Sequence, residues 1–194
     1  MKNILLISIL VFTYVSDASC VERITNTLQP KHGLKYEVND DNPFTGKYIT
    51  YFYKGKERKN KKEESNFNNG KLDGSSTFWY KSGEKRQELY YKDGKLNGLY
   101  TKWYKSGQKI LEINYKDHKR DGFSTHWHKN GQKSQEMTFH NGQGNGTFTS
   151  WYESGQKKSE ANYKNGKLDG KSTWWNKRGQ KIRQKEYKSG KLDG

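Results

Sequence analysis

Two histidines, His126 and His128, form the pair in this sequence whose spacing best suits a metal ion. Residues i and i+2 of a strand project from the same face, and the neutral imidazole is a common zinc ligand. However, no Cys or carboxylate stands at a matching position, and His128 occupies a place where equivalent segments carry Tyr. The sequence therefore favours a substitution within a repeated pattern over a metal centre, and it predicts no cofactor.

A regular column of glutamates could supply general acids or bases. Glu88, Glu112, Glu136 and Glu160 recur at one constant interval, and Gln184 continues the series. Equivalent carboxylates of neighbouring units would lie roughly 10 Å apart, each beside a Thr. Structural pairing across strands explains this arrangement without chemistry. We therefore predict no catalytic residue and a protein that is not an enzyme.

Aromatic and basic columns with the same period form a candidate binding surface. Rings next to Lys can hold bases, sugars or lipid headgroups, but the same columns can also hold a sheet together and keep it soluble. We favour a structural ladder for the Trp column, which is Trp79, Trp103, Trp127, Trp151 and Trp175. The remaining candidates for a binding surface are Tyr80, Tyr104 and Tyr152 together with Lys85, Lys109, Lys133, Lys157 and Lys181.

The elements that position these columns follow from a sequence repeat of constant period. The period is marked by glycines at Gly74, Gly98, Gly122, Gly146, Gly170 and Gly194. A further copy begins near Gly46 and takes four extra residues within a charged stretch. The repeat region is therefore 46–194, with units that start near residues 46, 74, 98, 122, 146 and 170.

Each unit carries two turn signals, which predict two strands joined by two-residue type I′ loops. Loops at Ser82-Gly83 and Asp93-Gly94 would place each Thr of the repeat opposite its Glu, and each Trp opposite the residue that follows the column Lys. They would also place the Tyr or Phe before the second turn opposite Leu, with Arg120 and Gly144 as exceptions. The predicted fold is all-β: an elongated, single-layer antiparallel β-meander built from about six 24-residue β-hairpins.

The unit GxxTxWYxSGQKxxExxYKNGKLDG, clearest in residues 146–170, resembles the MORN repeat variant of bacterial proteins identified as YwqK-type antitoxins. The resemblance covers about 149 of the 194 residues. It implies β-hairpin units that build an extended sheet, a toxin as partner, and contact with a membrane surface. An antitoxin against a cytoplasmic toxin would stay in the cytoplasm, so the N-terminus described next departs from that role.

The N-terminus has the features of an export signal. Lys2 precedes an apolar run over residues 4–15, and small residues lead to Cys20, the single cysteine. Residues 1–19 are predicted to be a signal peptide, and lipid attachment at Cys20, cleavage without a lipid and an unpaired thiol remain open. Asp17 departs from the lipoprotein pattern. Residues 20–45 are expected to be a linker or one N-terminal strand near residues 35–38.

Composition limits the class of protein and the kind of partner. Only 29% of residues are hydrophobic, whereas 14% are aromatic and the net charge is +16. Such a chain cannot build a thick aliphatic core, and regularly placed aromatics argue against disorder. The charge permits nucleic acid, anionic lipid or an acidic polymer as partner.

The sequence therefore predicts an exported, non-enzymatic repeat scaffold in the periplasm, at the outer membrane or on the cell surface. Its expected partner is a protein, with anionic membrane lipid or a surface polymer as alternatives. Nucleic acid is disfavoured for an exported protein. An antitoxin that binds a toxin and a peripheral protein on anionic membrane remain the two competing functions.

Overall fold

The computed structural model describes residues 23–193, so the predicted signal peptide and Cys20 lie outside the described part. These residues form a long ribbon of strands and contain no helix. Hence they contain no helix long and apolar enough to cross a membrane. The strands are β1 Ile24–Thr25, β2 Gln29–Lys31, β3 Leu34–Tyr36, β4 Gly46–Lys54, β5 Glu57–Asn68, β6 Lys71–Trp79, β7 Lys85–Lys92, β8 Lys95–Leu96, β9 Gly98–Trp103, β10 Lys109–Lys116, β11 Lys119–Trp127, β12 Lys133–His140, β13 Gln143–Gly144, β14 Gly146–Trp151, β15 Lys157–Lys164, β16 Lys167–Trp175, β17 Lys181–Lys188 and β18 Lys191–Leu192.

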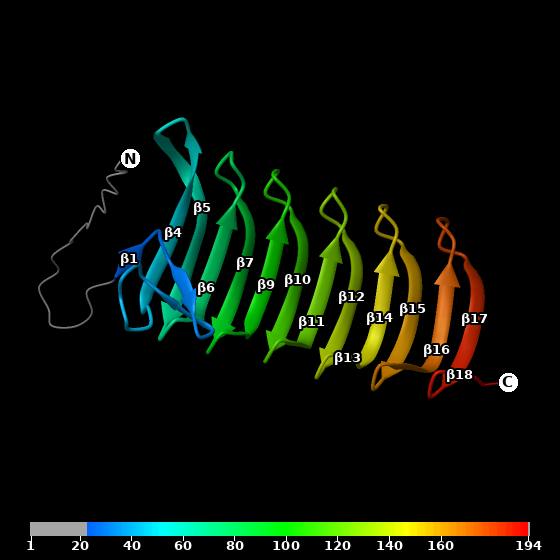
Figure 1. Cartoon of the computed structure of the whole chain (residues 1–194). Helices are drawn as coiled ribbons and strands as arrows, with labels where there is room; N and C mark the ends of the chain where they lie inside the picture. Colours follow the sequence, from blue (N-terminus) through cyan, green and yellow to red (C-terminus); the bar gives the residue numbers. More distant parts are fainter. Residues whose placement is uncertain (1–22, 194) are drawn as a thin grey trace, which may run out of the picture.

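The strands follow one another across a single open sheet, as Figure 1 shows. From β4 onward every pairing is antiparallel between consecutive strands, with β8 and β13 as short side branches of β7 and β12. The predicted all-β, single-layer antiparallel meander is therefore confirmed. The extra residues of the first unit lengthen the β4–β5 hairpin, which rises above the others.

The turns between units are the predicted type I′ loops. Asp93 and Gly94 both have positive φ, 50° and 79°, and the pairing of Tyr91 with Leu96 is as expected. The turns also bind one another, because the N–H of Gly94 donates to the carbonyl oxygen of Leu72 in the preceding turn (2.7 Å). Equivalent bonds connect all later turns, so each unit is fixed to its neighbour by backbone as well as by strand pairing.

The turns within units differ from the prediction. The carbonyl oxygen of Tyr80 accepts from the N–H of Gly83 (3.0 Å), and the N–H of Tyr80 donates to the carbonyl oxygen of Glu84 (2.9 Å), so a β-turn is followed by one residue with positive φ, Gly83. This longer loop introduces a bulge, and Trp79 pairs with Lys85 instead of Arg86. The two-residue loop and the predicted partner of Trp were therefore wrong, while the pairing of Thr with Glu is confirmed.

Two kinds of junction alternate along the ribbon. In one kind, an Asn lies at a register shift in the strand before the turn, and the strand after the turn is continuous. There Nδ2 of Asn66 donates to the carbonyl oxygen of Ser75 (2.8 Å), and Nδ2 of Asn114 donates to that of Phe123 (3.1 Å). In the other kind the strand is interrupted, as between β8 and β9. The structural period is consequently two hairpins, which is the spacing of Asn66, Asn114 and Asn162.

The N-terminal residues close one end of the ribbon. Phe44 is fully buried and lies 5.9 Å from the ring of Phe67, while its carbonyl oxygen accepts from the N–H of Gly70 (2.7 Å). Leu72 accepts in the same way one unit later, so Phe44 occupies the place of the repeat Leu, and the array begins before Gly46. In addition, β1 pairs in parallel with the outer edge of β4, and β2–β3 form a separate hairpin.

Little of the sheet is fully buried. The buried hydrophobic residues in the described part are Tyr36, Phe44, Ile49, Ile113 and Ala161, and the other buried residues are Ser, Thr and Gly. The face opposite the Trp column carries half-buried rings, and burial raises the pKa of both Tyr91 and Tyr100. Side chains on adjacent strands thus cover one another, in place of a second layer.

Candidate functional site

One face of the sheet carries an unbroken line of Thr and Glu. Thr101 pairs with Glu88 on one side and Glu112 on the other, and the same alternation continues in both directions. Thr101 and Thr125 are buried. We call this side the Trp face, because the Trp column lies on it beside the Thr positions.

The column lysines lie between these glutamates and the next tryptophan. Lys109 forms an ion pair with Glu112, and its Nζ stands 5.6 Å from the ring centroid of Trp127. Lys85 repeats the arrangement with Glu88 at 2.8 Å and Trp103 at 5.9 Å. The same two contacts recur for Lys61 and Lys157. Each of these lysines therefore connects two units through an ion pair and a cation–π contact.

Two members of the column are less engaged. Lys133 pairs with Glu136 at 2.8 Å, and no cation–π contact between Lys133 and Trp151 is found in residues 23–193. Lys181 donates to the Gln184 side chain at 3.0 Å instead of to a carboxylate. All the paired lysines remain about half exposed, so the column is a solvated lattice whose charges already have partners.

The candidate tyrosines also link neighbouring units. The hydroxyl of Tyr80 donates to the carbonyl oxygen of Trp103 (2.8 Å), and Tyr152 does the same to Trp175 (2.8 Å). His128 replaces Tyr in this position, with Nε2 3.0 Å from the carbonyl oxygen of Trp151. Tyr104 is half-buried at the equivalent place. The rings of Tyr80, His128 and Tyr152 are therefore held by the following unit, and a binding role for the tyrosines stays a prediction.

The candidate histidine pair, His126 and His128, lies within the strands and loop of one hairpin. His126 is half-buried, and burial together with the charge of Arg120 lowers its pKa, which favours the neutral form of the ring. Within residues 23–193 no three His, Cys, Asp or Glu side chains are grouped as a metal site would require. The described part therefore offers no metal centre.

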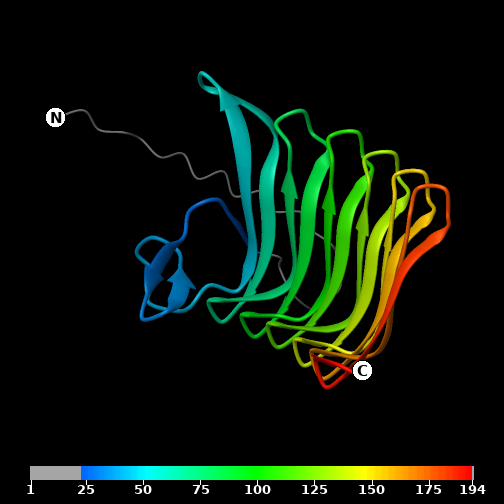
Figure 2. The ribbon, with the colours of Figure 1, turned by 90° about the vertical axis from the view of Figure 1, so that its right-hand side faces the viewer.

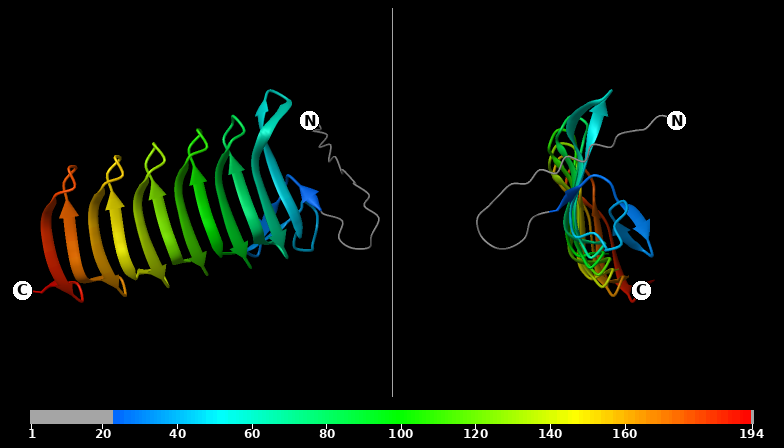
Figure 3. Two further views of the ribbon diagram at one scale, coloured as in Figure 1. Left: turned by 180° about the vertical axis from the view of Figure 1, so that it is seen from behind. Right: turned by 60° about the vertical axis from the view of Figure 1, so that its left-hand side comes forward.

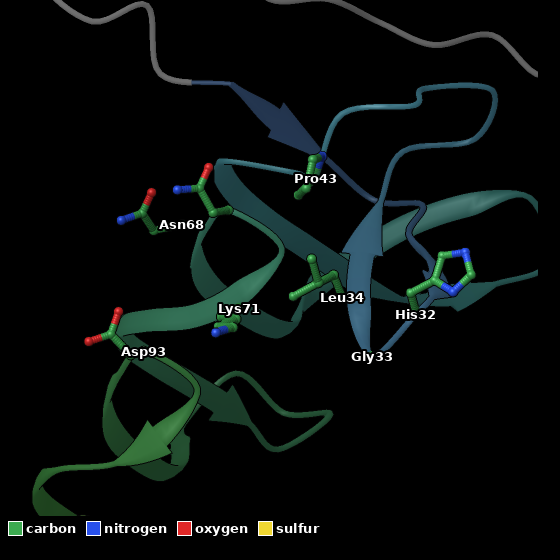
Figure 4. Close-up of a pocket in the computed structure, with 8 residues that line it drawn as sticks. His32, Gly33, Leu34, Pro43, Asn68, Lys71 and Asp93 are labelled. Atoms are coloured by element: carbon green, nitrogen blue, oxygen red, sulfur yellow. The ribbon is translucent and has the colours of Figure 1, made fainter.

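A hollow of about 550 Å³ lies beside the N-terminal hairpin and the first turns. Figure 4 shows that its polar side chains do not converge, because His32 and Asp93 lie on opposite sides of Leu34. This open surface depression lacks the enclosed, convergent polar groups of a small-molecule site.

Charge separates the two long edges of the ribbon. The loops within units, at the top of Figure 1, form a row that we call the tip row: residues 54–62, 81–86, 105–110, 129–134, 153–158 and 177–182. It contains 18 Lys and Arg against 3 Glu. The turns between units form the turn row, residues 68–73, 92–97, 116–121, 140–145, 164–169 and 188–193, with 10 Lys and Arg against 6 Asp. The tip row is therefore the strongly cationic edge.

Comparison with known proteins identifies the class of repeat. The model of the MORN repeat variant matches residues 72–93, 96–117 and 145–165, and thus three of the units. No curated protein matches the chain. MORN repeats generally mediate protein or membrane-lipid interactions and form scaffolds rather than enzymes.

Proposed function

We propose that this protein is an exported, non-enzymatic interaction scaffold of the bacterial envelope, and that its tip row meets the partner. The unequal distribution of charge carries the proposal. Five of the 18 basic residues of the tip row are lysines paired with a Glu outside the row, and the remaining 13 stand against only 3 acidic residues. The Trp face supports it, because most of the column lysines are already paired with Glu and Trp. The free cations stand on the loops.

Export rests on the N-terminal pattern of a charged residue, an apolar run and small residues before Cys20. Fractionation of cells that express the full chain tests it, with Cys20→Ala as the matched variant. Recovery in the envelope supports export. Loss of membrane retention in Cys20→Ala alone identifies lipid attachment, whereas recovery of both proteins in the cytoplasm overturns the proposal.

Binding to the envelope is tested with the purified protein and washed cell envelopes. The expected result is co-sedimentation that falls steeply as salt increases, because contacts between exposed charges are screened. Binding that persists unchanged in 1 M salt, or no binding at 50 mM salt, contradicts a role for the tip row.

An antitoxin-type protein that binds a toxin is the second candidate, and it rests on the resemblance to the YwqK-type family. Two exposed rings on the Trp face favour a protein partner: Phe123 is 62% exposed and Tyr90 is 40% exposed. Co-expression with the product of a neighbouring gene tests this role. The role is supported if the unaltered protein restores growth in the presence of that product and the Phe123→Ser variant does not. It is overturned if no neighbouring gene encodes a toxic product.

Peripheral binding to anionic membrane is the third candidate. The basic tip row would attract anionic headgroups, at roughly 1 kcal/mol per Lys near the surface. Vesicle co-sedimentation tests it, in the experiment described below.

A further inference from the structure

The tips of the hairpins carry cations that no neighbour neutralises. Lys81, Lys129 and Lys177 are exposed, and in residues 23–193 no carboxylate lies within ion-pair distance of them. The tip turns are closed by backbone bonds, as from the Gly131 N–H to the His128 carbonyl oxygen (3.0 Å), and the carbonyl oxygen of Lys81 accepts from Nδ2 of Asn60 in the preceding loop (3.2 Å), so no lysine side chain is needed for either. These lysines therefore serve neither the fold of the loop nor the lattice on the Trp face.

The tips are arranged at a regular spacing along one edge. Each unit adds two strands, so successive tips stand about 10 Å apart and six tips span on the order of 50 Å. This spacing is close to the Debye length at 0.1 M salt, so neighbouring tips repel each other little in physiological solution. A ligand with many closely spaced negative charges can nevertheless contact all of them at once.

The path of the row suits a flexible chain, and the side chains of the tips do not suit insertion into a bilayer. Figures 2 and 3 show that the tips step sideways and downward from β4–β5 to β16–β17, because the sheet twists. A flexible chain can follow such a stepped path from one tip to the next. The tips also lack side chains that enter a bilayer: residues 81–84, 105–108, 129–132, 153–156 and 177–180 contain no apolar residue.

We propose that the tip row binds a linear anionic polymer, held by one or more lysines from each successive hairpin. This inference rests on the proposed scaffold function and specifies its partner. Binding is multivalent, so a single phosphate or carboxylate is held weakly, while a chain long enough to reach several tips is held tightly.

The test uses long-chain inorganic polyphosphate as a linear probe and pyrophosphate as the short control, titrated from 50 to 500 mM salt. The variant Lys81→Gln/Lys129→Gln/Lys177→Gln removes three tip cations. Its matched control, Lys92→Gln/Lys164→Gln/Lys188→Gln, removes three exposed lysines of the turn row that likewise lack a carboxylate partner in the described part. Circular dichroism and thermal unfolding confirm that both variants fold.

Each cation that contacts the polymer contributes about 0.7 to the slope of log K against log salt, which is a factor of about 5 at 0.1 M. The tip variant should therefore bind polyphosphate roughly 100-fold more weakly at 0.1 M salt, with a slope smaller by about 2. The control should stay within threefold of the unaltered protein. Conversely, Glu153→Lys restores the tip lysine of its unit and should tighten binding about fivefold or more.

Three outcomes overturn the inference. Equal losses in both triple variants mean that net charge alone attracts the polymer. Binding to vesicles that contain anionic phospholipid, without binding to polyphosphate, assigns the tip row to a membrane surface. Salt-sensitive binding to envelopes without binding to polyphosphate or vesicles rejects the polymer but leaves the scaffold function intact.

Discussion

The contact of Lys109 with two neighbours predicts a measurable coupling between adjacent units. Its Nζ pairs with Glu112 and lies 5.6 Å from the ring centroid of Trp127. An exposed ion pair contributes about 0.2–1 kcal/mol, and an exposed cation–π contact contributes about 0.5–1 kcal/mol. Lys109→Met, which keeps the apolar stem, should therefore lower the free energy of unfolding by about 1 kcal/mol.

A double-mutant cycle isolates the part that belongs to the ring. Lys109→Met and Trp127→Leu, singly and together, should give a coupling free energy of about 0.5–1 kcal/mol. The measurement is urea unfolding followed by circular dichroism and fitted with a nearest-neighbour model, which suits a linear array of repeats. The cycle is repeated at high salt, where the ion pair with Glu112 is screened.

Lys133 and Trp151 provide the matched control. Lys133 has a similar exposed fraction, 48% against 44% for Lys109, and a similar ion pair, with Glu136. However, no cation–π contact between it and Trp151 is found in the described part. Because the effects of residues that do not interact nearly add, its coupling should be below about 0.3 kcal/mol. Equal couplings in both cycles, or none in either, would refute the idea that the column lysines tie units together through the tryptophans.

Three further predictions concern stability. Gly98→Ala should destabilise more than Gly146→Ala by about 1–3 kcal/mol in urea unfolding, because a Cβ at Gly98 would lie 2.9 Å from Tyr90 Cβ, whereas Gly146 has open space at a similar φ. Ser76→Ala should be neutral or stabilising, since the buried Oγ has no hydrogen-bond partner in the described part. Ser150→Ala should cost about 1 kcal/mol, because it loses the 2.7 Å bond to the hydroxyl of Ser159. Thermal unfolding compares the two variants, and a larger loss of stability in Ser76→Ala would contradict this difference in hydrogen bonding. Burial and Arg120 lower the pKa of His126 below 6.5, so its contribution to stability is complete above that pH and is lost as the pH falls through the lowered value. The free energy of unfolding of His126→Gln should therefore depend less on pH between about pH 7 and 5. An unchanged pH dependence would contradict the shift.

The sequence was sufficient to predict the meander because the signals that specify it are local. Two residues with positive φ, such as Asp93 and Gly94, set a type I′ turn and hence the register of Tyr91 and Leu96. The inner turn was mispredicted for an equally local reason: Gly83 alone has positive φ, and a longer loop with a bulge meets that requirement. The bulge then shifts Trp79 by one partner.

The contacts of the candidate surface were less predictable. Lys109 meets Trp127 only because consecutive units pair edge to edge, and this proximity is not visible in the pairing within one hairpin. Equivalent places in successive units hold Asn66, Tyr90 and Asn114, and this alternation indicates the two kinds of junction. Comparing each unit only with the next does not reveal it, because the alternation has a period of two units. The place of Phe44 in the repeat was not predicted, because Phe stands there instead of the repeat Leu.

Salt should act in opposite directions on the stability of the folded ribbon and on the binding of a polyanion by the tip row. The two measurements therefore separate the repulsion between the tip lysines from their role in binding. Two lysines about 10 Å apart in water repel each other by roughly 0.4 kcal/mol before screening. Salt weakens this repulsion and so relieves the folded ribbon, while it also weakens attraction to a polyanion. The triple variant of Lys81, Lys129 and Lys177 should therefore be more stable than the unaltered protein at 10 mM salt, yet bind polyphosphate more weakly. A variant that loses stability and binding together would instead show that these lysines support the fold.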